Sequence, residues 1–273
     1  MDYKRILTIQ DISCVGQCSL TVALPIISAC GVETAILPSA VLSNHTAFSG
    51  FTFKDLTDEI PNIKDEWARQ NIKFSAVYTG YLGSADQVDH VKAIMNELLE
   101  DRSIRIVDPA MADHGILYTG FDMEFVQQMK SLCQAADVIL PNITEACLLT
   151  DTPYREEYDI DYITTLFERL SNICSRVVLT GVSFNPHNSG IAVYDNGDVQ
   201  YYEHKKVGDG CHGTGDVYAS AFVGAIMNGH SIYSAAKTAA DFTLLCIENT
   251  VNHKEHWYGV RFEPVLKELI KML

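Results

Sequence analysis

The chain has 273 residues, of which 47% are hydrophobic and 20% are charged, a composition typical of globular proteins with a substantial core. Its formal net charge is −15 and its largest basic cluster is His204-Lys205-Lys206, so the chain would repel a nucleic-acid backbone. No stretch approaches a membrane span or a signal peptide, and the eight scattered cysteines form no Cys-x-x-Cys pair, so we expect a cytoplasmic protein with reduced thiols and neither a nucleic-acid nor a membrane partner.

Short apolar strands alternate with amphipathic helices along most of the chain. Because the strands are apolar throughout instead of alternating, they indicate a mostly parallel sheet covered by helices on both faces. The expected strands are 5–9, 34–37, 74–80, 104–110, 137–142 and 176–182, and the expected helices are 17–30, the segment through Val88 and Leu99, 122–134, 144–150 and 159–173.

The last third of the chain departs from this alternation. Asn196-Gly197 predicts the turn of a β-hairpin, and three helices follow, at about 214–228, 231–249 and 262–272. Since no linker is visible, we expect one doubly wound α/β domain over residues 1–273. In such folds a ligand lies beyond the carboxyl ends of the strands, where the chain carries Asp11, Asn44-His45-Thr46, Thr79-Gly80-Tyr81, Asp108-Pro109, Pro141-Asn142 and Thr180-Gly181, which we expect to converge on one cleft.

A glycine-rich stretch, VGDGCHGTGDVYASAF, begins at Val207. It matches the dinucleotide fingerprint at Gly208, Gly210 and Gly213, but the helix that follows leads into more helix and not into a strand, so an NAD site is excluded. A Walker A loop is excluded because Thr214 stands where its lysine should be.

What remains of that stretch is Gly213-Thr214-Gly215-Asp216 at the start of an apolar helix. Backbone N–H groups there can hold an anion, and the Asp216 carboxylate can take a proton from an attacking hydroxyl, as in phosphoryl transfer. The alternative is a capped, tightly packed helix start without a catalytic role.

Three polar residues could form a metal group. Asp108 and Asn142 end neighbouring strands, and Glu145 lies one turn into the next helix, so their oxygens suit Mg²⁺ with retained water. The alternative is that Asn142 and Glu145 form a capping pair at a helix start, and both readings can hold together.

GTGDVYASAF resembles the anion-hole and catalytic-aspartate segment of ribokinase-superfamily kinases. Four further segments narrow the resemblance to the pyridoxal kinase family, because they resemble its motifs in family order, from about residue 5 to about residue 250. These segments are LSNHTAFSG, VYTGYLGS, IVDPAMAD and ADVILPNITEACLLT. The resemblance implies a ribokinase-like fold, a homodimer, ATP and Mg²⁺ as cofactors, and allows for a monovalent cation such as K⁺.

The resemblance also implies a role for each matching residue. Asp216 would be the base for the 5′-hydroxymethyl group of a B6 vitamer, and Gly213, Thr214 and Gly215 would hold the transferred phosphoryl group. ATP would be bound near Asp113, Thr180 and Thr214, and Mg²⁺ near Asp108, Asn142 and Glu145. The vitamer would contact Asp11, Ser13, Asn44, His45, Thr46 and Tyr81, and the loop from Asp113 to Gly120 would cover the site.

The chain departs from the family at Asp11, where members commonly carry serine. A carboxylate facing the ring would favour a cationic group, such as the ring nitrogen or the aminomethyl group of pyridoxamine; alternatively, Asp11 binds local backbone and Ser13 contacts the ring. We interpret Cys211 and His212 as loop residues without a role in the reaction. For His45, the alternative to a contact with the vitamer is a structural role in its loop. Rival functions are a hydroxymethylpyrimidine kinase and a non-catalytic vitamer-binding protein.

Overall fold

The computed structural model describes residues 4–208 and 210–273, which divide into two compact units. The first unit is Met1–Ser103 with Val207–Leu273, and the second is Ile104–Lys206. Strand β5 (Leu99–Val107) begins in the first unit and ends in the second. The predicted mixed α/β fold, with a large, mostly parallel sheet, is confirmed, whereas the prediction of a single domain stays a prediction.

The sheet of the first unit is built around β1 (Arg5–Ser13), which pairs in parallel with both β2 (Glu33–Leu42) and β4 (Phe74–Thr79). The short β3 (Phe53–Asp55) is antiparallel to β2. Ile6, Leu7 and Ile9 are fully buried, as expected for a strand covered on both faces. The register between β1 and β2 shifts between Gln10 and Ile12, so an irregularity lies at Asp11.

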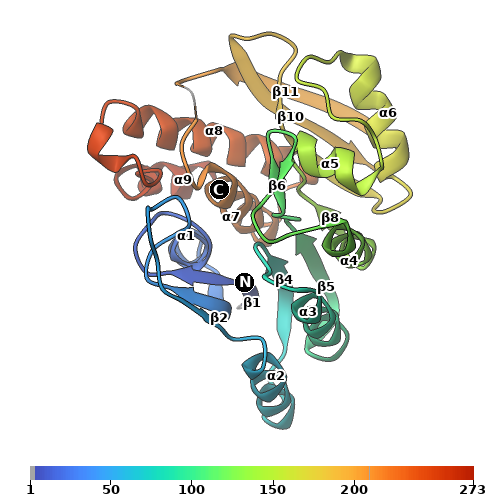
Figure 1. Ribbon diagram of the computed structural model, residues 1–273, viewed down its shortest axis with the longest axis vertical. Helices are drawn as coiled ribbons and strands as arrows, with labels where there is room; N and C mark the ends of the chain where they lie inside the picture. The colour runs from blue at the N-terminus through green and yellow to red at the C-terminus, as the bar shows by residue number, and fades with distance from the viewer. Residues whose placement is uncertain (1–3, 209) are drawn as a thin grey trace. The chain divides into compact units, whose positions relative to one another are not determined.

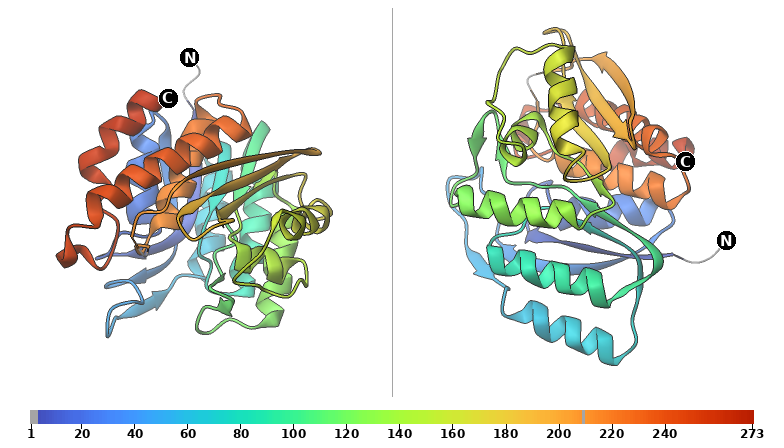
Figure 2. Two further views of the ribbon diagram at one scale, coloured as in Figure 1. Left: turned by 90° about the horizontal axis from the view of Figure 1, so that it is seen from above. Right: turned by 90° about the vertical axis from the view of Figure 1, so that its right-hand side faces the viewer.

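Among its described residues, the first unit has six α-helices and two 3₁₀ helices. The α-helices are α1 (Leu20–Ala29), α2 (Glu59–Arg69), α3 (Ala85–Glu97), α7 (Thr214–Met227), α8 (Ile232–Thr250) and α9 (Leu266–Met272), and the 3₁₀ helices are Lys254–His256 and Glu263–Val265. Helix α1 packs on β1, β2 and α7, and α7 packs on α8 (Figure 1). Helices α2 and α3 lie side by side (Figure 2). Helix α7 is buried over most of its length from Val217 onward, whereas its first turn, 214–216, is partly exposed.

In the second unit the end of β5 pairs in parallel with β8 (Val138–Ile139), and β8 pairs in parallel with β9 (Arg176–Val182). The hairpin of β10 (Asn188–Asp195) and β11 (Asp198–Lys205) adds two antiparallel strands. Its helices are α4 (Met123–Gln134), α5 (Ile143–Leu149) and α6 (Ile160–Leu170), and a second hairpin joins β6 (Ala112–Asp113) to β7 (Ile116–Leu117).

The predicted hairpin turn is confirmed, because Asn196 and Gly197 have φ angles of 51° and 105°, the positive values that this turn requires. Four elements were not predicted. The strand β3 is exposed along its length and produces no apolar pattern, whereas α2 carries Ile60, Ile63 and Trp67 at a helical spacing that was overlooked. Strands β6 and β7 have two residues each and occupy part of the segment predicted to be a covering loop. Within the described residues, no helix is long and apolar enough to span a membrane.

Candidate active site

Asp11 lies near the carboxyl end of β1 and is buried, with 5% of its surface exposed. The Ser13 hydroxyl donates to its Oδ2 at 2.9 Å and the Ser19 hydroxyl donates to its Oδ1 at 2.5 Å. Burial raises the pKa of Asp11, and the two serine hydroxyls act in the opposite direction. Both carboxylate oxygens therefore have a fixed donor, which holds the plane of the carboxyl group in one orientation.

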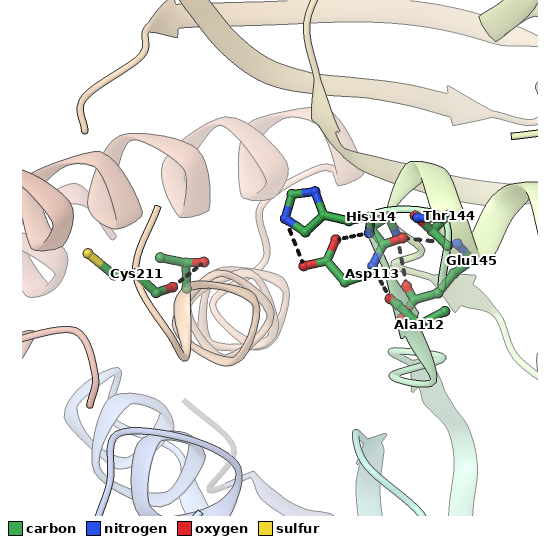
Figure 3. A network of polar contacts seen from close by, with 9 residues as sticks. Ala112, Asp113, His114, Thr144, Glu145 and Cys211 are labelled. Atoms are coloured by element: carbon green, nitrogen blue, oxygen red, sulfur yellow. Dashed lines mark hydrogen bonds and ion pairs between the residues drawn. The ribbon is translucent and has the colours of Figure 1, made fainter. Parts of the chain in front are cut away.

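Gly213 caps the N-terminus of α7 in the left-handed region, with φ 79°. A Cβ at this position would lie 1.7 Å from the carbonyl oxygen of Gln17, so no side chain fits. At Gly215, by contrast, a Cβ would meet nothing within 4 Å. Gly213 is thus required by packing, whereas Gly215 leaves open space beside the first backbone N–H groups of α7, where an anion could approach. The Thr214 hydroxyl donates to the carbonyl of Cys211 at 3.2 Å (Figure 3).

Asp216 lies in the first turn of α7, where its side chain is partly accessible but surrounded mainly by protein atoms. Burial raises its pKa to about 7, the nearby backbone N–H of Ser19 acts to lower the pKa, and the charge of Asp11 raises it. A carboxylate that exchanges its proton near neutral pH is suited to general-base catalysis, because it is ionised often enough and basic enough.

The loop 43–50 is held by its own polar side chains. The Asn44 amide donates to the carbonyl of Gly50 at 2.8 Å and accepts from the Ser43 hydroxyl. His45 accepts at Nδ1 from the backbone N–H of Ala47, so its Nε2 carries the proton and donates to the carbonyl of Tyr258 at 2.6 Å. The structural alternative for His45 is therefore present in the structure, and Asn44 shapes the same loop.

Two further predicted vitamer residues also lie in the first unit. Thr46 is exposed on the loop next to His45. Tyr81 follows β4, and burial raises its pKa, with smaller contributions from Asp11 and Asp55. The charge of Asp11 raises the pKa of both Tyr81 and Asp216, so Asp11 is an electrostatic neighbour of both side chains.

In the second unit, Asn142 and Glu145 form a complete capping box at the start of α5. The Asn142 Oδ1 accepts from the N–H of Glu145, and its amide nitrogen donates to the carbonyl of Ala112 at 2.8 Å. The two oxygens of Glu145 accept from the backbone N–H groups of Met111 and Asn142. Burial raises the pKa of Glu145, because a charge there has left water.

Three predicted nucleotide and metal residues surround this capping box. Asp113 accepts from the N–H of His114 in the tight turn between β6 and β7, while the N–H of Gly115 donates to the Thr144 hydroxyl (Figure 3). Thr180 lies beside Asn142, and its hydroxyl and N–H both reach the carbonyl of Pro141. Asp108 follows β5 directly.

The side chains of Asn142 and Glu145 already bind backbone groups, so direct coordination of Mg²⁺ would compete with the hydrogen bonds that hold the capping box. In residues 4–208 and 210–273 no cluster of three or more His, Cys, Asp or Glu side chains could hold a metal ion. The arrangement fits an ion that keeps its own water shell, which is the usual behaviour of Mg²⁺. The metal group stays a prediction, as does convergence of all the strand ends on one cleft.

The cysteines are free thiols at all eight positions, so the prediction of reduced thiols agrees with the structure. Burial raises the pKa of Cys211, which argues against a reactive thiolate beside the glycine turn. The prediction that the fingerprint at Gly208 to Gly213 is not a dinucleotide site is supported, since α8 follows α7 directly.

Comparison with known proteins decides the family. The phosphomethylpyrimidine kinase family matches residues 27–261 of the chain. The chain belongs to this family. A Bacteroides thetaiotaomicron protein described as a "putative phosphomethylpyrimidine kinase", and crystallised with pyridoxal, is 37% identical with a TM-score of 0.92, over 98% of this chain and 96% of that one.

Other proteins to which the chain is similar carry the pyridoxal kinase name. The crystal structure of pyridoxal kinase from Lactobacillus plantarum is 30% identical with a TM-score of 0.91, over 98% of this chain and 97% of that one. The pyridoxine/pyridoxal/pyridoxamine kinase of Bordetella pertussis is 27% identical, over 90% of this chain and 89% of its own length. The resemblance to the pyridoxal kinase family and the ribokinase-like fold are therefore confirmed.

Sequence reasoning missed Ser19 and Gln17 in this site. Ser19 stands directly before an apolar helical run and has the sequence signature of an ordinary N-cap. Gln17 contributes a backbone carbonyl, which carries no signal in its residue type. Both act through local geometry that the sequence pattern does not encode.

Proposed function

We propose that the chain is an ATP-dependent kinase that phosphorylates the 5′-hydroxymethyl group of a B6 vitamer. The observation that carries the proposal is Asp216, a carboxylate with its pKa raised to about 7, next to the left-handed turn at Gly213. Family membership and the relatives named pyridoxal kinase support the same reaction class.

In this reaction Asp216 accepts the proton of the vitamer hydroxyl as that oxygen attacks the γ-phosphorus of ATP. The bond from phosphorus to the bridging oxygen of ADP breaks, and the proton stays on the Asp216 carboxyl group until product leaves. A base whose pKa lies near neutrality balances the fraction ionised against the strength of proton abstraction.

The transferred phosphoryl group binds the backbone N–H groups of Gly213, Thr214 and Gly215. The partial positive charge at the N-terminus of α7 adds to this attraction. Such local neutralisation is needed, since the chain as a whole carries a net charge of −15 and repels phosphate.

ATP would bind near Asp113, Thr180 and Thr214, and Asp108, Asn142 and Glu145 would hold Mg²⁺, mainly through water. When bound, the ion would supply positive charge that offsets the charge of the phosphates. A monovalent cation such as K⁺ near the glycine turn is part of the proposal as well; its support is the family resemblance.

The vitamer binds the first unit through Asp11, Ser13, Asn44, His45, Thr46 and Tyr81. The orientation of Asp11 by two serine hydroxyls leaves its remaining lone pairs as acceptors, which suits a cationic substrate group. Asn44 and His45 contribute by holding the shape of the loop that carries Thr46.

A second candidate function is phosphorylation of hydroxymethylpyrimidine. It is favoured by the description of the matched family and by that of the Bacteroides relative. The chemistry at Asp216 is the same for both substrates, so the two candidates differ only in the ring that is bound.

We further propose that the protein is a cytoplasmic homodimer. Free thiols at all eight cysteines support a reducing compartment. Exposed apolar side chains at Val15, Phe51, Phe53 and Trp257 would be covered in a dimer of the kind that the family resemblance implies. Measurement of the molar mass in solution tests the second point.

The test of function is ATP consumption by the purified protein with and without Mg²⁺. Pyridoxal, pyridoxine, pyridoxamine and hydroxymethylpyrimidine are supplied separately, and Asp216→Asn is the control. Turnover on a vitamer that is lost in the control supports the proposal, and turnover on the pyrimidine alone moves it to the second candidate. Binding of a vitamer without any turnover would instead indicate a non-catalytic vitamer-binding protein.

A further inference from the structure

Ser19 lies near two carboxylates of the candidate active site. Its hydroxyl donates to Oδ1 of Asp11 at 2.5 Å, and its backbone N–H lies close enough to Asp216 to lower the pKa of that carboxyl group. The two carboxylates come from elements far apart in the sequence, β1 and α7. Ser19 is therefore a single-residue link between the side chain that faces the vitamer and the proposed base.

The backbone of Ser19 is bent to make this link. Its φ of 51° and ψ of −133° lie in a region of positive φ that residues with a Cβ rarely adopt. The contacts that surround it, including the N–H groups of Val22 and Ala23 bound to its carbonyl, hold it there. Strained backbone of this kind often lies at functional sites, and here it lies beside two carboxylates.

Ser19 differs from the serines at two other helix starts in the hydrogen bond that its hydroxyl makes. Ser84 and Ser231 cap α3 and α8 in the ordinary way, with the hydroxyl accepting a backbone N–H from the first turn. Ser19 stands at the same position of α1 but makes no side-chain cap hydrogen bond. Its hydroxyl binds Asp11 instead, so helix capping does not explain the serine at this position.

The charges around the pair leave Asp11 as the main electrostatic neighbour of Asp216. Cys18 also faces Asp216, but burial raises the pKa of its thiol to about 12, so it stays neutral. Around Asp11 lie His45 and Tyr81, and Tyr81 in turn faces Asp55. The spacing between Asp11 and Asp216 thus decides how strongly one carboxylate acts on the other.

We propose that Ser19 is a positioning residue that fixes Asp216 through its backbone N–H and ties it to Asp11 through its hydroxyl. This inference rests on the proposed function of Asp216 as a base. The link keeps the base in place for the substrate hydroxyl, and it keeps the charge of Asp11 close enough to maintain the basicity of Asp216.

The sign of the pH effect follows from this geometry. The Asp11 charge raises the pKa of Asp216, and loss of the Ser19 hydroxyl both releases Asp11 and favours its protonated form. Each change weakens the charge that Asp216 experiences. Removal of the hydroxyl therefore shifts the acid limb of the kcat profile to lower pH while kcat at its plateau falls.

The first experiment compares Ser19→Ala with Ser231→Ala, a matched change at an ordinary helix cap. We expect Ser19→Ala to lower kcat by about 10- to 100-fold with a much smaller change in the KM for ATP, and to shift the acid limb. Ser231→Ala should lower the melting temperature and leave both the plateau and the pH profile of kcat unchanged. If the two variants behave alike, Ser19 is only structural.

A double-mutant cycle with Asp11→Asn tests whether the Ser19 hydroxyl affects Asp216 through Asp11. If the hydroxyl acts through Asp11, Ser19→Ala should shift the acid limb in the wild-type background and have little further effect in the Asp11→Asn background. Additive shifts in the two backgrounds would overturn the proposal that the hydroxyl acts through Asp11.

The backbone half of the proposal is tested in the free protein by NMR. The amide signal of Ser19 should follow the ionisation of Asp216 as the pH is raised, and this response should vanish in Asp216→Asn. A signal that is flat in the wild type overturns the proposal. Because this measurement needs no substrate, it separates failure of the positioning role from failure of the proposed function, which the turnover assay reports by itself.

Discussion

At the scale of single residues, the ionised Asp216 side chain should serve catalysis and at the same time destabilise the folded state. Its pKa is raised to about 7 because burial disfavours the charged form. Above that pH the folded protein must keep a charge that the unfolded chain would hold in water, so the carboxylate destabilises the fold while it serves as a base.

The variant Asp216→Asn should therefore lose turnover and gain stability. We expect a fall in kcat of at least about 1000-fold and a rise in the free energy of unfolding at about pH 8 of about 1–3 kcal/mol. Urea unfolding checks the second value. At about pH 2.5, where the wild-type carboxyl group is mostly neutral in both the folded and the unfolded state, the difference in stability should vanish. A variant less stable than the wild type at pH 8 would contradict the argument.

Asp11 determines the choice of vitamer in our proposal. Two serine hydroxyls orient its carboxylate, so it presents an anionic acceptor to the ring or to its substituents. We expect Asp11→Ser to lower kcat/KM for pyridoxamine relative to pyridoxal by about tenfold, because the cation loses its partner. Competition assays with both vitamers measure the ratio. An unchanged ratio would mean that Asp11 serves only to hold Ser13, Ser19 and Asp216.

At the scale of elements, the two glycines at the start of α7 should have different roles, Gly213 in packing and Gly215 in binding the phosphoryl group. Gly213→Ala places a Cβ 1.7 Å from the Gln17 carbonyl and forces a left-handed φ on alanine, so we expect a loss of about 2–4 kcal/mol in unfolding free energy. Gly215→Ala meets open space inside a helix and should leave stability unchanged or raise it slightly. Chemical unfolding of both variants measures the contrast.

The same pair tests the anion site. If the phosphoryl group binds at Gly215, the added methyl group of Gly215→Ala should raise the KM for ATP or lower kcat in a protein that is fully folded. Normal kinetics for Gly215→Ala would place the phosphoryl group elsewhere.

The strand ends, the hairpin turn and the glycine turn could be predicted because each depends on residue type in a fixed place. An apolar run stops at Asp11 or Thr180, and Asn196-Gly197 fits few backbone conformations. The role of Ser19 could not be predicted, since its sequence context is that of an ordinary cap and its use depends on contacts with β1 and α7. Helix α2 could have been predicted, because Ile60, Ile63 and Trp67 stand at helical spacing and form an apolar stripe that was overlooked.

At the scale of the whole molecule, stability should fall as the pH rises from about 4 to about 8. For a carboxyl group whose pKa is raised on folding, the folded state binds more protons than the unfolded chain between the two pKa values, so the slope of unfolding free energy against pH is negative. Asp11 and Asp216 both contribute in this direction. The net charge of −15 adds self-repulsion that grows over the same range.

Salt separates these two causes. Repulsion between surface charges is screened over about 10 Å at 0.1 M salt, whereas the burial of Asp216 is not. We therefore expect added salt to recover part of the stability lost at about pH 8, and Asp216→Asn to recover a further part that salt does not. Melting temperatures of the wild type and the variant at two pH values and two salt concentrations test this. Full recovery by salt alone would mean that Asp216 is solvated when ionised, and its basicity would then need another cause.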